Sequence, residues 1–256
     1  MTVAVLSPHL DDAVLSCWSV LTSREEVVVI TLFAGLPAPG AKLRGWDRVT
    51  GATDARRRMR ERRKEDRQAL ALAARSPVHL DFLEQPYREH EPRVEELASA
   101  IAGHLPPSAR IYAPAAIKGH PDHVLTRTTA LALDSVTDIA LYADLPYATR
   151  FGWPPRMTGE PASAHVDVDA FWSAELEGVR ERFAASPSFT PLSGAQQADK
   201  LRAMRAYRTQ FPGLDGGPQR RLSHPALLGF EAAWTARARP LEVPRHGGSV
   251  AVRWTR

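Results

Sequence analysis

Short runs of β-branched and other apolar residues recur along the first part of the chain, and they constrain its fold more than any other feature. The clearest run is V-V-V-I-T-L-F at residues 27–33, and similar runs occupy residues 2–7, 79–83, 110–115 and 137–143. Stretches of helical composition separate them, at residues 14–22, 52–74, 92–104 and 122–133. A strand that is covered on both faces is apolar throughout, and strands that alternate with helices form layered structures. We therefore predict an α/β fold with a mainly parallel sheet.

The alternation weakens after Pro146, where several prolines interrupt the pattern, although residues 195–210 still predict a helix. The segments at 34–51 and 148–195 read as long loops, which is typical of chain that carries a binding site. We expect one Rossmann-like domain over residues 1–256. Its core would span residues 1–147, and a smaller, irregular C-terminal portion at 148–256 would shape the pocket.

The composition excludes several classes of protein. Hydrophobic residues make up 44% of the chain and charged residues 24%, which is the composition of a globular protein and not of a disordered or fibrous one. Cys17 is a single cysteine, so an intramolecular disulfide is impossible, and this fits a reducing compartment. No apolar run approaches the ~20 residues of a membrane span, and the N-terminus lacks the features of a signal peptide. We expect a cytoplasmic protein without a membrane span.

Two histidine- and aspartate-rich motifs follow predicted strands. Pro8-His9-Leu10-Asp11-Asp12 comes at the end of the first strand, and Gly119-His120-Pro121-Asp122-His123 follows the fourth. Each motif alone is also compatible with an ordinary capped turn. The carboxyl ends of parallel strands meet at one edge of a sheet, however, so the two motifs are expected to converge there. Three nitrogen and oxygen ligands with one open position are typical of a catalytic zinc site, and Fe(II) or Co(II) would also suit them.

These two motifs, in this order and each after a strand, resemble the PIG-L/LmbE family of metal-dependent de-N-acetylases. Further similarities are the segments at 62–67 (R-R-K-E-D-R), at 144–147 (D-L-P-Y, as in an actinobacterial-type subgroup) and at 200–210. The resemblance implies that His9, Asp12 and His123 bind the metal, with Zn²⁺ as the expected ion. It further implies that Asp11 is the general base and that a protonated His120 helps the tetrahedral intermediate to form and collapse.

Three positions near the motifs allow more than one interpretation. Asp122 either orients a neighbouring imidazole or only caps the helix that follows. Ala13 stands where the family usually has an acid, which is not a ligand in the family pattern. Lys118 stands where some relatives carry a tyrosine that assists the oxyanion, and it is either a cationic substitute or a solvated surface lysine. We favour the surface position, because lysine is seldom buried.

Arginines are concentrated at residues 56–67, with acids at pairing distances among them. A solvated helix with internal ion pairs accounts for this pattern better than a nucleic-acid site does. The resemblance implies that Arg62 and Arg88 contact the substrate, although a frame based on Arg58 is also compatible with the R-x-x-E pattern. Trp46 and Trp153 lie in predicted loops and are candidates for a sugar-stacking rim.

The motifs and the resemblance together predict an enzyme, namely a zinc-dependent hydrolase that removes an N-acyl group. The expected acyl group is acetyl. The expected substrate is an amino sugar such as N-acetylglucosamine or a glycosylated small molecule. A role in antibiotic or other natural-product biosynthesis would fit the resemblance. We expect a small-molecule substrate and no nucleic-acid partner. The alternatives are a metal-dependent hydrolase of another amide or ester bond and a basic protein that binds nucleic acid or anions through residues 56–67.

Overall fold

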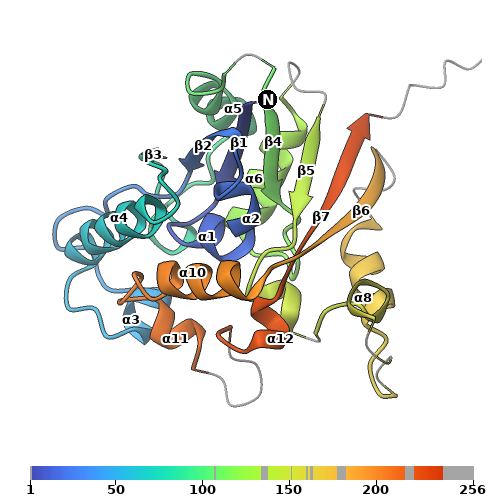
Figure 1. Ribbon diagram of the computed structural model, residues 1–256. Coiled ribbons are helices and arrows are strands. Elements are labelled where there is room, and N and C mark those ends of the chain that lie inside the picture. The colour runs from blue at the N-terminus through green and yellow to red at the C-terminus, as the bar shows by residue number, and fades with distance from the viewer. Residues whose placement is uncertain are drawn as a thin grey trace, which may run out of the picture.

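One sheet organises the part of the chain that the computed structural model describes, namely residues 2–106, 108–133, 138–150, 152–159, 161, 164–177, 183–216 and 222–238. Its strands lie in the order β3-β2-β1-β4-β5-β7-β6 (Figure 1). The strands are β1 (Thr2–Ser7), β2 (Glu26–Thr31), β3 (Pro77–His79), β4 (Arg110–Pro114), β5 (Ile139–Tyr142), β6 (Phe183–Pro191) and β7 (Phe230–Ala238). Strands β1 to β5 pair in parallel, which confirms the predicted α/β class.

Helices cover both faces of this sheet. Helix α10 packs against α1, α2 and α4, whereas α5 packs against α6 on the other side (Figure 1). The longer helices are α4 (Ala55–Ala71), α5 (Val94–Ala102), α6 (Pro121–Leu131), α8 (Val168–Glu175) and α10 (Gly194–Met204). Shorter ones are α1 (Asp12–Ser16), α2 (Trp18–Leu21), α3 (Gly45–Val49), α7 (Pro155–Thr158), α11 (Phe211–Leu214) and α12 (Pro225–Leu228), with 3₁₀ turns η1 (Gln85–Tyr87) and η2 (Tyr147–Thr149). None of the described helices has the length and apolar character that crossing a membrane requires.

The sheet has its topological switch point between β1 and β4. From β1 the chain continues to β2 and β3 on one side, and it then crosses to β4 on the other side of β1. In open α/β sheets of this kind, ligands bind beyond the carboxyl ends of the strands that flank such a point. The two histidine motifs leave the sheet at exactly these two strand ends.

Several expected elements differ from the structure. The helix expected at 14–22 is divided into α1 and α2, because Cys17 leaves the helical conformation at φ −132° and ψ 30°. The third strand ends at His79, where a strand to residue 83 was expected, and beyond it only an isolated bridge joins Asp81 to Phe33. The expected loop at 34–51 contains the short helix α3.

The prediction that the C-terminal portion is irregular is wrong for two long strands. Strand β7 pairs antiparallel with β5, and β6 pairs antiparallel with β7, so both extend the same sheet. Two of the prolines that interrupt the sequence pattern, Pro187 and Pro191, lie on β6 at the edge of the described sheet, where a missing N–H is tolerated.

A buried ion pair joins this C-terminal portion to the N-terminal helices. Lys200 of α10 is fully buried, and its Nζ lies 2.7 Å from Oε1 of Glu231 on β7. The Glu231 carboxylate also accepts hydrogen bonds from the backbone N–H groups of Trp18 and Ser19 and from the Ser19 hydroxyl. Helix α10 is thereby held beside α2, close to the edge of the sheet that carries the motifs.

Candidate active site

The turn after β1 fixes the first motif through its own hydrogen bonds. The Ser7 hydroxyl donates to the carbonyl of His9 and accepts from the N–H of Ala13. The backbone N–H of His9 donates to Oδ2 of Asp12 at 2.7 Å, so the imidazole and the carboxylate leave the turn side by side. Asp11 is the N-cap residue of α1, but its side chain makes no capping hydrogen bond. Its carboxylate is therefore free to accept a proton.

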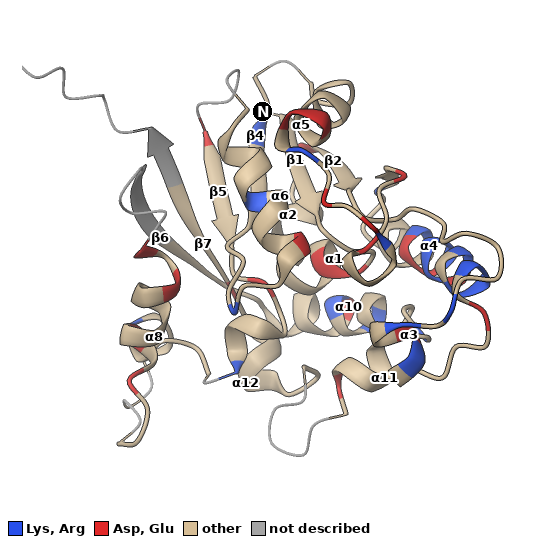
Figure 2. Ribbon diagram, turned by 180° about the vertical axis from the view of Figure 1, so that it is seen from behind, with Lys and Arg blue, Asp and Glu red and all other residues tan. Residues whose placement is uncertain are grey.

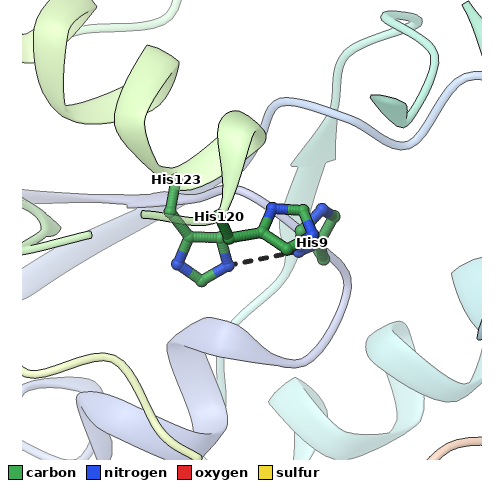
Figure 3. Close-up of side chains that lie close together, drawn as sticks. All are labelled: His9, His120 and His123. Atoms are coloured by element: carbon green, nitrogen blue, oxygen red, sulfur yellow. Dashed lines mark hydrogen bonds between the residues drawn. The ribbon is translucent and has the colours of Figure 1, made fainter. Parts of the chain in front are cut away.

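The second motif begins helix α6. His120 is the N-cap residue, and its Nδ1 accepts a hydrogen bond from the N–H of Asp122. Pro121 occupies the first helical position, which suits a residue without an N–H. His123 follows one turn later and is completely buried, and Figure 3 shows its ring beside those of His9 and His120.

Three candidate ligand atoms form a nearly equilateral triangle. Nδ1 of His9 lies 3.3 Å from Nε2 of His123, and Oδ2 of Asp12 lies 3.4 Å from each of these two nitrogens. Two ligands of a tetrahedral zinc ion, each about 2.0–2.1 Å from the metal, are about 3.3–3.4 Å apart. The triangle thus fits such an ion without rearrangement. His120 offers a fourth ligand atom, within 4.8 Å of those of His9 and His123.

Both histidines of the triangle engage a carboxylate through their other ring nitrogen. Nε2 of His9 lies 2.9 Å from Oδ2 of Asp122, and Nδ1 of His123 lies 3.1 Å from Oδ2 of Asp144. This arrangement fixes the tautomer and leaves the opposite nitrogen free for a metal. Of the two interpretations of Asp122, the structure favours the orienting one, because the cap of α6 is His120. The sequence analysis did not single out Asp144, although its position directly after β5 was a usable signal.

The two adjacent aspartates, Asp11 and Asp12, have very different pKa values, because burial and neighbouring charges act on them differently. Burial and the charge of Asp12 raise the pKa of Asp11 to about 7, against the opposing effect of Arg62. Burial also acts to raise the pKa of Asp12, but His123 and His9 outweigh it and lower that pKa to about 2. Asp12 is therefore ionised, as a ligand must be, whereas Asp11 is able to take up and release a proton near neutral pH.

The imidazole of His120 is held in one tautomer. Because Nδ1 accepts the N–H of Asp122, the proton of the neutral ring lies on Nε2. Burial, followed by the neighbouring His9 and His123, lowers the pKa of His120 to about 4. The lowered pKa favours the neutral ring, in which Nε2–H is a hydrogen-bond donor. The protonated form that the resemblance implied stays a prediction.

A cavity of about 510 Å³ opens over the triangle, within the size range of small-molecule sites. Its polar wall includes Arg62, whose Nη1 lies 2.6 Å from Oε1 of Glu84 and 3.8 Å from Oδ1 of Asp47. Gln210 adds a buried amide oxygen that has no hydrogen-bond partner among the described residues. The sequence pattern did not reveal Glu84 or Gln210 as site residues. Apolar lining comes from Leu15, Pro86, Leu145, Pro146 and Leu214, together with the aromatic rings of Trp46 and Tyr147.

Other predicted site residues lie elsewhere. Arg88 is absent from the described lining and instead forms an ion pair with Asp122. The ammonium of Lys118 lies 5.4 Å from the centre of the Phe171 ring at the surface, which matches the surface position favoured from the sequence. Trp153 is buried and stacks on Trp172, so it is not part of a sugar-binding rim.

A comparison with family models agrees with this geometry. The family described as PIG-L, GlcNAc-PI de-N-acetylase, matches residues 4–133. The chain belongs to the PIG-L family. PIG-L proteins are metal-dependent hydrolases that remove N-acetyl groups, and this chain is accordingly a metal-dependent N-deacetylase. The matched segment contains both motifs and ends just after α6.

Solved structures similar to this chain include deacetylases of teicoplanin biosynthesis and of the A40926 pseudoaglycone. A triple mutant of a deacetylase of the teicoplanin pathway is 26% identical, with a TM-score of 0.71 over 93% of this chain and 99% of that one. A deacetylase of the A40926 pseudoaglycone is 25% identical, with a TM-score of 0.69 over 93% and 98%. A zinc-inhibited form of a teicoplanin deacetylase is 23% identical, with a TM-score of 0.69 over 93% and 99%. No curated protein sequence matches the chain.

Proposed function

We propose that this PIG-L protein is a zinc-dependent hydrolase that removes an N-acetyl group from an amino sugar carried by a glycosylated small molecule. One observation carries the proposal: the triangle of His9, Asp12 and His123 at 3.3–3.4 Å, beside the unbonded carboxylate of Asp11. The ligand set of two imidazoles and one carboxylate suits zinc, and also Fe(II) or Co(II). A divalent ion at this position lowers the pKa of water toward ~7 and polarises the amide carbonyl of the substrate.

The residues of the chain then supply the proton transfers. Asp11 takes a proton from the attacking water and returns it to the amide nitrogen as the C–N bond breaks, so that acetic acid and a neutral amine are formed. The acid then passes its proton to the amine, and acetate and a protonated amine leave. A carboxyl with a pKa near 7 is suited to both steps. His120 donates its Nε2–H to the oxyanion that develops on the carbonyl oxygen. Asp122 and Asp144 keep the rings of His9 and His123 in their binding orientations.

The amino-sugar part of the substrate is supported by the polar wall of the cavity. The cavity offers ligand hydroxyls hydrogen-bond donors and acceptors, which come from Arg62, Glu84 and Gln210. Trp46 adds an aromatic ring to the lining. Sites with few polar groups and a mainly apolar lining are typical for small molecules. The relatives from the teicoplanin and A40926 pathways support a glycosylated natural product as the substrate class.

The C-terminal portion belongs, in our proposal, to the same single domain as residues 1–147. Two observations support this: β7 pairs with β5, and Gln210, Gly213 and Leu214 contribute to the lining of the cavity. The portion after residue 147 would thus complete the substrate pocket through residues 210–214. The segment at 148–195, which was expected to be a long binding loop, contains α7, α8 and β6 and contributes no residue to the described lining.

The test is the release of acetate and free amine from a panel of N-acetylated sugars and glycosides. Metal-free protein is reloaded separately with Zn²⁺, Fe²⁺ or Co²⁺ at one equivalent and at excess, because zinc inhibits one of the similar deacetylases. We expect activity at one equivalent and none in the metal-free protein. Phosphoesters and simple esters in the same panel test the alternative hydrolase functions. Turnover of these alone would refute the proposal.

A further inference from the structure

Cationic side chains without partners gather in the segment that leads into α3. Lys42, Arg44 and Arg48 lie within seven residues, all three are exposed, and none forms an ion pair in the described part of the chain. Figure 2 shows the Lys and Arg residues of α3 and α4 on the same side of the molecule, with acidic residues among them.

Several arginines of α4, by contrast, form ion pairs with neighbouring acids. Nε of Arg57 lies 2.9 Å from Glu61, and Nε of Arg58 lies 3.3 Å from the same carboxylate. Arg63 pairs with Asp81. Helix α4 thus contains ion pairs, as the sequence predicted, although Arg60, Lys64 and Arg67 are exposed and form no ion pair in the described part of the chain. What distinguishes Arg44 from these residues is its place in the lining of the cavity.

Arg44 stands at the cavity, and its backbone is held in place. Its N–H donates to the hydroxyl of Tyr87 at 3.2 Å, and that hydroxyl donates to Oδ2 of Asp47 at 2.8 Å. The next residue, Gly45, has a φ of +48° and lies so close to Pro86 that an added Cβ would be 3.0 Å from its ring. The backbone is thus fixed on both sides of the bond that follows Arg44. Arg44 is exposed, lines the cavity, and forms no ion pair in the described part of the chain.

The two arginines of the cavity consequently differ in what they are able to bind. The positive charge of Arg62 is balanced inside the cavity by ion pairs with Glu84 and Asp47, so the Arg62 guanidinium is suited to bind neutral hydroxyls. Arg44 forms no such ion pair in the described part of the chain. An unpaired guanidinium binds a carboxylate or a phosphate through two parallel hydrogen bonds. A positive surface around it also attracts anions from a distance.

We infer that the substrate of this deacetylase carries an anionic group, a carboxylate or a phosphate, and that Arg44 binds it at the cavity while the N-acyl group lies at the metal centre. This inference rests on the proposed function, which it deepens by naming a chemical class of substrate. Lys42 and Arg48 add to the local field without contacting the reacting amide.

The experiment compares matched substrates in the zinc-loaded full-length protein. The substrates are a neutral N-acetylglucosamine glycoside, its 6-carboxylate and its 6-phosphate. The proteins are wild type, Arg44→Gln and Arg60→Gln, whose side chain is also exposed but lies on α4 outside the described lining. We expect Arg44→Gln to raise KM for the preferred anionic substrate by about tenfold or more, which is the contribution of one charge-assisted pair. KM for the neutral substrate stays within about twofold, and Arg60→Gln changes neither.

Two further measurements make the result decisive. Raising NaCl from 0.05 to 0.5 M should increase KM for the anionic substrate in wild type and much less in Arg44→Gln, since salt screens exposed charges. Calorimetric binding of the corresponding deacetylated amino sugars gives a readout that does not depend on turnover. The carboxylate and phosphate arms show which anion is preferred.

The outcomes separate this inference from the proposed function. If no N-acetylated sugar releases acetate, the proposed function fails. If acetate is released but neutral and anionic substrates are equivalent, or if Arg44→Gln affects both equally, the function stands and only the role of Arg44 is refuted.

Discussion

Replacing Asp144 isolates the contribution of a buried carboxylate to metal binding. Its Oδ2 accepts both the N–H of Ile117 at 3.0 Å and Nδ1–H of His123 at 3.1 Å, and Asp144 is completely buried. In Asp144→Asn, an amide oxygen at the position of Oδ2 keeps both hydrogen bonds and removes only the negative charge. Removing the partner of a metal-binding histidine weakens metal binding about 10–100-fold. We expect the lower end for this variant, about tenfold or about 1.4 kcal/mol.

Asp144→Ala removes the acceptor as well as the charge. Two buried donors then lose their partner, at about 1–3 kcal/mol each, so we expect metal binding about 100-fold weaker and a lower free energy of unfolding. Competition with a chelating dye measures the affinity, and urea unfolding measures the stability. Asp199→Asn is the matched control, because its side chain is 48% exposed and pairs only along α10. Wild-type metal affinity in Asp144→Asn together with a loss below threefold in Asp144→Ala would show that Asp144 does not act through His123.

Four further changes test other parts of the structure. Asp11→Asn should retain the metal and lose about 10²–10⁴-fold in kcat, the usual contribution of a general base; loss of metal would instead make Asp11 a ligand. His123→Ala should bind no stoichiometric metal by elemental analysis, and full occupancy would contradict the triangle. Glu231→Gln should lower the free energy of unfolding in urea by about 3–5 kcal/mol, because it leaves the buried ammonium of Lys200 without its counter-charge. Lys200→Met should cost less, about 1–2 kcal/mol, since the carboxylate keeps three other donors; the reverse order would refute this reasoning. Burial raises the pKa of Cys17 well above its usual value, so the thiol should stay protonated and unreactive toward a disulfide reagent at pH 8 until urea unfolds the chain; rapid reaction of the folded protein would show that the thiol is accessible.

The sequence determined the elements and motifs whose information is local. Apolar runs placed the five parallel strands to within a few residues, because a strand covered on both faces needs no polar side chain. The two motifs were located at strand ends, so their convergence followed from the geometry of parallel sheets. The convergence of the two motifs was thus predictable from the sequence, whereas the choice of His9, Asp12 and His123 within them came from the resemblance to the family.

Tertiary structure alone decided which distant residues complete the site. Asp144 contacts His123 across 21 positions, and Asp122 contacts His9 across 113. Glu84 faces Arg62 because the segment after β3 returns beside α4. Periodicity and spacing carry information over a few residues, so the sequence placed Asp122 and Asp144 near strand or helix ends but did not specify which imidazole each of them contacts.

The same limit explains the C-terminal portion and the tautomer of His120. Strands β6 and β7 exist because β5 leaves an edge to which β7 hydrogen-bonds, and their own sequences, with prolines on β6, do not predict strands. The choice of Nε2 as the protonated nitrogen of His120 depends on one N–H of the helix that it caps. The sequence supplies the chemical groups, and long-range packing and hydrogen bonding decide which of them are buried together and in which protonation state, because desolvation and partner geometry exist only in the folded chain.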